Sequence, residues 1–263
     1  ALQLGVISEP LEGKEMSILY ITGAGVSAES GIPTFRGKDG FWTIGSVNYT
    51  PQEMATRAMY LTHPDEFLLW YFRRFASYRH IQPNNVHDWL AGKKLITQNI
   101  DGLDGKAGNA DYIPIHGRLD KVTVLHAQGD EVELFDAPWE KVVATCSNLE
   151  NDAEVKAALL EAFKISKTTL APAIEHSLKP FVLLFDEYYT ELYRMSLAES
   201  WMREAEHFVF MGTSFSVNIT NIALRYALAS GAKIEVVDPE PVDLGLKGIT
   251  YHRMTAQTYV SRE

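Results

Sequence analysis

The stretch from Leu19 to Gly37 constrains the fold more than any other part of this chain. It begins inside a short apolar run, Ile18 to Ile21, which has the length and β-branched content of a buried parallel strand. The letters G-A-G-x-S follow at once. Because glycine has no Cβ, the backbone there can approach a diphosphate, whose charge is met by N–H groups at a helix start. The pattern favours a phosphate-binding turn, and a tight strand-to-helix turn without a ligand is the alternative.

The residues after this turn predict a loop rather than a long helix. Pro33 lies between Gly31 and Gly37, and these residues end the helix early. Phe35 and Arg36 can then fold over a molecule bound at the turn. A common dinucleotide-binding crossover would instead continue as a helix.

The whole pattern, G-A-G-x-S-x-x-S-G-I-P-x-F-R-G, resembles the sirtuins, the NAD-dependent protein deacylases. Three further patterns resemble the same family: T-Q-N-I-D-x-L from Thr97, H-G from His116 and G-T-S from Gly212. Sirtuins usually have Asn where Asp238 stands, and the family's V-x-P is here V-N-I at 217–219. From the first glycine to Asp238, the resemblance covers nearly the full chain.

The resemblance implies that NAD is a consumed cosubstrate and that the partner is an acylated-lysine protein or peptide. It implies that His116 is the catalytic base, that Asn99 and Asp101 line the pocket of the nicotinamide carboxamide, and that Gln98 contacts the nicotinamide ribose. A lone histidine after an apolar run is more often structural. An imidazole that titrates near neutrality nevertheless suits proton removal from a ribose hydroxyl. The implied NAD-binding residues are Gly23, Ala24, Gly25, Ser27, Phe35, Arg36, Gln98, Asn99, Ile100, Asp101, His116, Gly212, Thr213, Ser214 and Asp238.

The segment from Pro180 to Glu187 resembles the family's P-x-V-x-F-G-E strand, with Asp186 in place of Gly. We expect it to return to the main sheet and to offer an exposed edge to the acyl-lysine peptide. The substrate-binding residues expected in this segment are Val182, Phe185, Asp186 and Glu187.

Arg73 matches the arginine of the Tyr-x-x-Arg pattern by which sirtuins that act on acidic acyl groups resemble one another. Trp70 stands in place of the tyrosine, and Lys38 follows Gly37 where a small residue would leave room for a longer acyl chain. Arg73 is therefore a substrate-binding candidate with a structural role as the alternative, and desuccinylation is not predicted.

The region from Leu119 to Lys179 departs most from the family. Sirtuins commonly hold a structural zinc there on two C-x-x-C pairs, whereas Cys146 is the only cysteine in this chain, so no zinc is expected. His126 and His176 have no metal-motif spacing with Cys146. The sequence predicts instead a hairpin from residues 122–126 and 131–135, and a helix within 148–163 capped by Asn151.

Apolar strands alternate with helical stretches, which predicts an α/β fold with a Rossmann-like parallel sheet and an inserted small domain lacking the zinc module. The predicted division is 1–117 and 181–263 for the NAD-binding domain and 118–180 for the insert. Helices are expected to begin at Pro51, with Thr50 as N-cap, and near Pro64.

No apolar run reaches membrane-spanning length and no signal peptide is recognisable, so a cytoplasmic protein without a membrane partner is predicted. A formal net charge of -10 argues against direct nucleic-acid binding and is compatible with a lysine-rich peptide.

Three other functions remain open at this point. The same chemistry with another acceptor would make the protein an ADP-ribosyltransferase or an NAD hydrolase. An ordinary NAD(P) oxidoreductase is disfavoured by the early end of the first helix. The third alternative is a non-catalytic NAD-binding or peptide-binding module.

Overall fold

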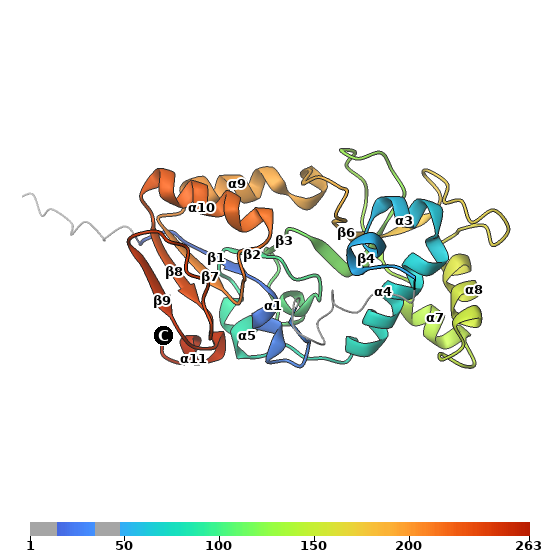
Figure 1. The fold of residues 1–263 in the computed structure, drawn as a ribbon, viewed down its shortest axis with the longest axis horizontal. Coiled ribbons are helices and arrows are strands. Elements are labelled where there is room, and N and C mark those ends of the chain that lie inside the picture. The colour runs from blue at the N-terminus through green and yellow to red at the C-terminus, as the bar shows by residue number, and fades with distance from the viewer. Residues whose placement is uncertain (1–14, 35–47) are drawn as a thin grey trace, which may run out of the picture.

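The computed structural model describes residues 15–34 and 48–263 (Figure 1). Phe35, Arg36 and Lys38, which the sequence singles out, lie outside the described residues. The strands are β1 Ile18–Thr22, β2 Leu95–Thr97, β3 Ile113–Pro114, β4 Gly117–Val124, β5 Phe135–Asp136, β6 Leu178–Val182, β7 His207–Met211, β8 Lys233–Val237 and β9 Ile249–His252. The helices are α1 Ala24–Ala28, α2 Pro51–Met54, α3 Arg57–Thr62, α4 Pro64–Tyr78, α5 Asn85–Leu90, α6 Leu103–Lys106, α7 Trp139–Thr145, α8 Asp152–Ala162, the 3-10 turn η1 Glu191–Tyr193, α9 Met195–Glu204, α10 Asn218–Ser230 and α11 Ala256–Val260.

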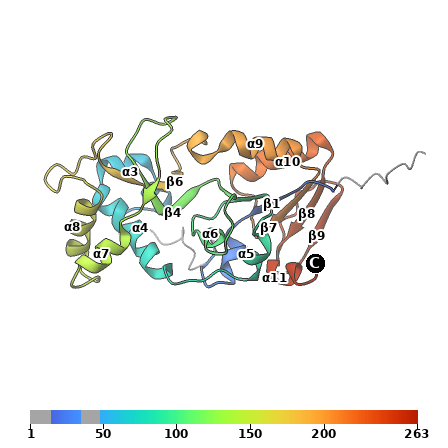
Figure 2. The same cartoon turned by 180° about the vertical axis from the view of Figure 1, so that it is seen from behind.

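The larger sheet is parallel throughout, and within the described ranges its strand order is β3-β2-β1-β7-β8-β9. Helices α9 and α10 cover one face, and α5 and α11 cover the other (Figures 1 and 2). Successive residues of a strand point to opposite faces. Accordingly Leu19 and Ile21 pack in the cluster that contains α9 and α10, while Tyr20 packs with α5 and α11. The Rossmann-like α/β sheet expected from the sequence is confirmed.

The smaller sheet is antiparallel, with strand order β5-β4-β6 among the residues described. The expectation that Pro180 to Glu187 returns to the main sheet is wrong, because β6 pairs with β4, with Gly117 opposite Val182. An apolar strand sequence indicates burial but does not say which sheet will accept the strand. The chain rejoins the parallel sheet only at β7. Strand β6 is an edge strand of the small sheet, as peptide capture would require.

The predicted hairpin is only partly correct. Strands β4 and β5 do pair, with Val122 opposite Phe135, but β5 has two residues and residues 131–134 form no strand. Most of 131–136 is exposed. The alternation of polar and apolar residues there therefore buries no face of a strand, and nothing sets a longer pairing with β4.

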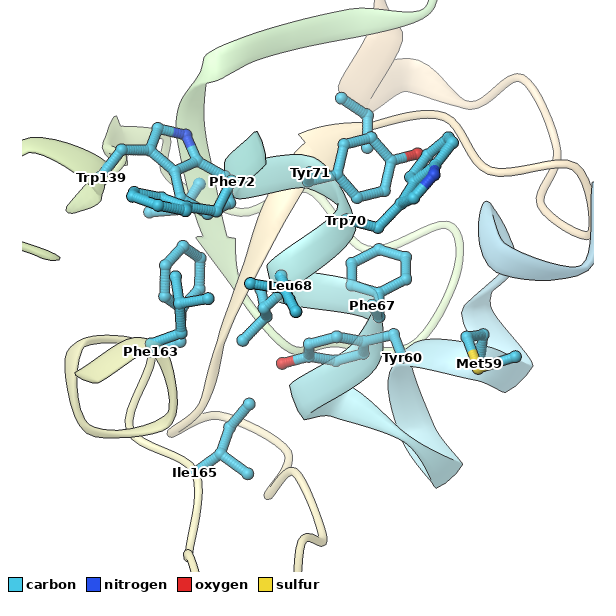
Figure 3. Packing of buried hydrophobic residues seen from close by; sticks show 14 of the residues in the cluster. Met59, Tyr60, Phe67, Leu68, Trp70, Tyr71, Phe72, Trp139, Phe163 and Ile165 are labelled. Atoms are coloured by element: carbon cyan, nitrogen blue, oxygen red, sulfur yellow. The ribbon is translucent and has the colours of Figure 1, made fainter. Parts of the chain in front are cut away.

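Helix α4 supplies the core of the part around the small sheet (Figure 3). Phe67 and Phe72 of this helix are fully buried. Trp139 of α7 and Phe163 at the end of α8 pack there with ring centroids 4.8 Å apart. Full burial of a side chain as large as Phe contributes about 1.5–3 kcal/mol to folding. Residues 54–72 therefore share one apolar cluster with residues 119–184.

The helix starts predicted from capping residues are confirmed. Thr50 Oγ1 accepts from the backbone N–H of Glu53 at 3.2 Å, with Pro51 at the first helical position. Asn151 Oδ1 accepts from the N–H of Glu154 at 3.2 Å. Throughout 15–34 and 48–263, no helix has the length and apolarity needed to cross a membrane.

Candidate active site

The carboxyl ends of β1, β2, β7 and β8 meet at one edge of the parallel sheet, because these strands are adjacent and run in the same direction. Gly23, Gln98, Gly212 and Asp238 are the residues that follow these four strands. Open α/β sheets bind their ligands at this edge. The structure thus brings together four segments that the sequence assigned to one site.

Three glycines allow two turns to touch. The N–H of Gly23 donates to Met211 O at 2.9 Å, and that of Gly25 donates to Gly212 O at 3.0 Å. A Cβ on Gly23 would lie 2.7 Å from Gly212 O, and one on Gly25 would lie 2.7 Å from Gly212 Cα. Gly212 itself has a φ of +62°, where an L side chain is strained. The N–H groups of Gly23 and Gly25 are therefore used between the turns, and the bare backbone of the crossing leaves no side chain there to keep a large anion away.

Asn99, Asp101 and Ser27 form a polar cluster beside this crossing. Ser27 Oγ donates to Asp101 Oδ2 at 2.6 Å, and Asn99 Nδ2 donates to Gly23 O at 2.9 Å. The other carboxylate oxygen of Asp101 accepts from the N–H of Leu103. The amide and the carboxylate are thus fixed in orientation before any ligand binds.

Gln98 connects two of the converging segments. Its Nε2 donates to Thr213 Oγ1 at 3.1 Å and to Thr22 O at 3.3 Å. Ser214, one residue further on, is exposed and bonds Ser216. Asp238 accepts from the N–H of Glu240, and burial raises the pKa of its carboxyl. These contacts hold the predicted ribose-facing side chains at the rim of the site.

Two residues at the start of α5 contact the segment around Ser27, and the sequence did not single them out. Asn84 caps α5 and also donates through Nδ2 to Val26 O at 2.9 Å and Ser30 Oγ at 2.8 Å. His87 Nδ1 accepts from the N–H of Asn84, so the neutral ring carries its proton on Nε2, 3.5 Å from Ser27 Oγ. Burial lowers the pKa of His87 and keeps it neutral, although the charge of Asp101 opposes the shift. The spacing N-x-x-H before an apolar helix could have indicated this cap.

His116 lies between β3 and β4, directly before Gly117, and both of its ring nitrogens have hydrogen-bond partners. Nδ1 lies 3.1 Å from Gln98 O, and Nε2 lies 3.0 Å from the hydroxyl of Tyr189. Burial lowers the pKa of His116 to about 4, and the bond to Gln98 O opposes this shift only in part. The expectation of an imidazole that titrates near neutrality is therefore wrong, and near pH 7 the ring is wholly in its basic, neutral form.

The residues expected to bind substrate have structural contacts. Asp186 accepts from the N–H groups of Arg57 and Ala58, which makes it a cap for α3. Glu187 is buried and pairs with Arg57 at 3.1 Å and Lys179 at 3.3 Å. Val182 is buried in β6, while 55% of Phe185 is exposed.

Arg73 also has a structural role. Its guanidinium donates to Leu149 O and to Asp152 Oδ1, the latter at 2.6 Å, and so ties α4 to the start of α8. In the described part of the chain, no group of three or more His, Cys, Asp or Glu residues is arranged to hold a metal ion.

The fold and the site together define a class of protein. Parallel strands that end at two touching glycine turns, beside an oriented amide, carboxylate and neutral imidazole, are typical of a dinucleotide site equipped for proton transfer. The chain belongs to the Sir2 family, whose model matches residues 23–219.

Individual relatives agree with this membership. The NAD-dependent protein deacylase of Thermus thermophilus is 32% identical over 244 residues, which cover 89% of this chain and 82% of the relative. NAD-dependent protein deacylase 1 of Caldanaerobacter subterraneus subsp. tengcongensis is 27% identical over 264 residues, covering 98% and 96%. A solved Sir2 homologue in complex with NAD has a TM-score of 0.68 and 26% identity, covering 94% of this chain and 87% of that chain.

Proposed function

We propose that this protein is an NAD-dependent protein-lysine deacylase that consumes NAD and gives nicotinamide and O-acyl-ADP-ribose. The observation that carries the proposal is the neutral His116 imidazole, held by Gln98 O at the same sheet edge as the Asn99 and Asp101 cluster. The relatives named above support it, since they are NAD-dependent protein deacylases.

The residues present fit NAD. The crossing of Gly25 and Gly212 leaves no room for a Cβ, which suits the close approach of a diphosphate. Gln98, Thr213, Ser214 and Asp238 offer amide, hydroxyl and carboxylate groups for the two riboses. Ala24 and Ile100 flank these groups in the sequence, and Phe35 and Arg36 are proposed as further contacts of the bound molecule.

Bound NAD supplies a glycosidic bond whose cleavage exposes an electron-poor ribose carbon. Asn99 and Asp101 would orient the nicotinamide carboxamide for that cleavage, with Ser27 fixing the carboxylate. The acyl oxygen of the substrate lysine would then attack the ribose carbon as nicotinamide leaves. His116 would receive the proton of a ribose hydroxyl, whose oxygen attacks the acyl carbon. Water would add to the acyl carbon as its bond to the lysine nitrogen breaks, which releases the free lysine amine and O-acyl-ADP-ribose. Positioning and exclusion of bulk water would provide much of the acceleration.

The acyl-lysine segment is proposed to add along the edge strand β6 and the residues after it. Val182 ends this strand, and the exposed Phe185 follows it. Leu183 N donates to His116 O at 2.8 Å, so the backbone after the edge strand is hydrogen-bonded to the backbone of the base. Asp186 and Glu187 would act by holding this segment in place through Arg57.

The finer assignments belong to the same proposal. We propose that the insert 118–180 needs no zinc, since one cysteine cannot supply two C-x-x-C pairs, and that the residues that bind NAD lie within 1–117 and 181–263. We also propose the cytoplasm as the location. Metal analysis of the purified protein and cell fractionation test the zinc and location assignments directly.

The experiment is mass spectrometry of NAD incubated with the protein, with and without an acetyl-lysine peptide. Peptide-dependent nicotinamide together with O-acetyl-ADP-ribose is the expected result. Free ADP-ribose without peptide would make the protein an NAD hydrolase or transferase, and unchanged NAD with a range of acyl peptides would refute catalysis. Asn99→Ala, which removes the amide but leaves His116 in place, should lower nicotinamide release by about 100-fold or more.

A further inference from the structure

Tyr189 contacts the one ring nitrogen of His116 that could act as a base. Its hydroxyl oxygen lies 3.0 Å from Nε2, and the two rings stack with centroids 5.9 Å apart and planes 24° apart. Tyr189 lies between the edge strand β6 and the turn η1, 73 residues after the histidine. Nothing in the sequence pattern of the site refers to this residue.

The positions of the hydrogen atoms follow from the partners. Gln98 O can only accept, so Nδ1 of His116 carries the proton and Nε2 presents its lone pair. Burial raises the pKa of Tyr189 to about 12, so the phenol is protonated and donates to Nε2. The backbone N–H of Ile219 lies near the phenol oxygen and opposes this rise in pKa. A directed chain thus runs from the Tyr189 hydroxyl to His116 and ends at Gln98 O.

A substrate hydroxyl cannot donate to Nε2 while Tyr189 does. The phenol oxygen has two lone pairs, and the bond to Nε2 uses its proton rather than either of them. Tyr189 is only half-buried, so a lone pair is available to a hydroxyl that enters the site.

We propose that Tyr189 is a catalytic residue that relays the substrate's proton to His116. The inference rests on the proposed deacylase function, in which a ribose hydroxyl must lose its proton. The O–H bond of that hydroxyl breaks and its proton binds the phenol oxygen, while the phenol's own proton moves to Nε2 of His116. The ribose oxygen keeps the electron pair, Tyr189 ends as a neutral phenol, and His116 ends as an imidazolium.

The Ile219 N–H would assist this relay. It is one of the first N–H groups of α10, a helix of 13 residues, and so lies at the positive end of the helix dipole. It stabilises negative charge that builds on the phenol oxygen when the two proton transfers are not simultaneous. A proline at 219, as in the V-x-P pattern that this chain lacks, has no N–H to donate.

The test compares Tyr189→Phe with Tyr188→Phe, which removes a hydroxyl from the exposed neighbouring ring. Two rates are measured on each protein: exchange of labelled nicotinamide into NAD in the presence of an acetyl-lysine peptide, and formation of O-acetyl-ADP-ribose. Tyr189→Phe should lower product formation about 100-fold and leave exchange within about twofold, because only the step after nicotinamide loss needs the base. Tyr188→Phe should change neither rate. Unchanged product formation, a gain in rate, or an equal loss of both rates in Tyr189→Phe would overturn the relay.

A second readout needs no turnover. In the protein labelled with ¹⁵N-histidine and free of NAD, the pKa of His116 should rise in Tyr189→Phe, because a donor to the neutral ring is lost. An unchanged titration would overturn the hydrogen bond on which the relay depends. If wild-type protein releases no nicotinamide with any acyl peptide, the proposed function fails, and this titration alone decides whether Tyr189 is coupled to the base.

Discussion

Replacement of Gly117 by alanine should destabilise the protein by an amount that the backbone geometry sets. Gly117 follows His116 and has a φ of +87°. A Cβ there would overlap the carbonyl oxygen of Phe181 and lie 2.8 Å from its carbonyl carbon and 3.0 Å from Val182 Cα. These atoms are backbone of β6, paired with β4 at this point, so no side chain can rotate away.

Two costs contribute to the expected loss. A left-handed backbone costs an L residue about 1–2 kcal/mol, and forcing a methyl group into a packed region costs about 1–3 kcal/mol. The free energy of unfolding should therefore fall by roughly 2–5 kcal/mol. At about 2 °C per kcal/mol for a chain of this size, the melting temperature should fall by roughly 4–10 °C.

Gly108→Ala is the matched control, measured by calorimetry beside Gly117→Ala. Gly108 has a nearly equal φ of +91°, but a Cβ there would meet nothing within 4 Å. It should lose only the backbone term, about 1–2 kcal/mol. Equal melting temperatures for the two variants would refute the close approach of β4 and β6 at Gly117.

Two further predictions concern titratable groups. The pKa of His116 is about 4 in the folded protein, whereas its usual value is 6.5. As the pH falls, the unfolded state therefore binds a proton on this ring before the folded state does. The free energy of unfolding should fall by up to about 3 kcal/mol as the pH drops from 6.5 to 4. His116→Ala should remove that part of the pH dependence in urea titrations, and an unaltered slope would contradict the shift. Glu235 lies between His207 Nε2 at 2.5 Å and His252 Nε2 at 2.9 Å, and despite burial these contacts hold the pKa of its carboxyl below the usual range. Glu235→Gln should lower the free energy of unfolding near pH 7 by about 1.5–3 kcal/mol, and this difference should shrink in acid. The control, Glu206→Gln at an exposed position, should change the free energy of unfolding by no more than about 0.5 kcal/mol. Equal losses in the two variants would argue against the buried cluster.

Local chemistry explains what the sequence could predict. Some elements depend only on residues within four positions of one another, so the local sequence pattern predicts them. Examples are the strand Ile18–Thr22 and the helix caps Thr50 and Asn151. The meeting of Gly23, Asn99 and Gly212 was predictable as well, because adjacent parallel strands must end at one edge.

Long-range pairing explains what the sequence could not predict. The apolar run at β6 fits either sheet, and only the register with β4 decides. The contact of Tyr189 with His116 joins residues 73 positions apart, and no periodicity marks it. The pKa of His116 depends on how closely the folded chain surrounds the ring, which composition does not contain.

The touching turns at Gly25 and Gly212 have a consequence for protein engineering. Each turn fits only because the other has no side chain at the crossing. In a chimera with a Sir2 relative, residues 22–31 and 211–217 should therefore be exchanged together. A library that varies either segment alone would recover mostly glycine at the crossing, whatever property is selected, and productive diversity would be found in the residues on either side.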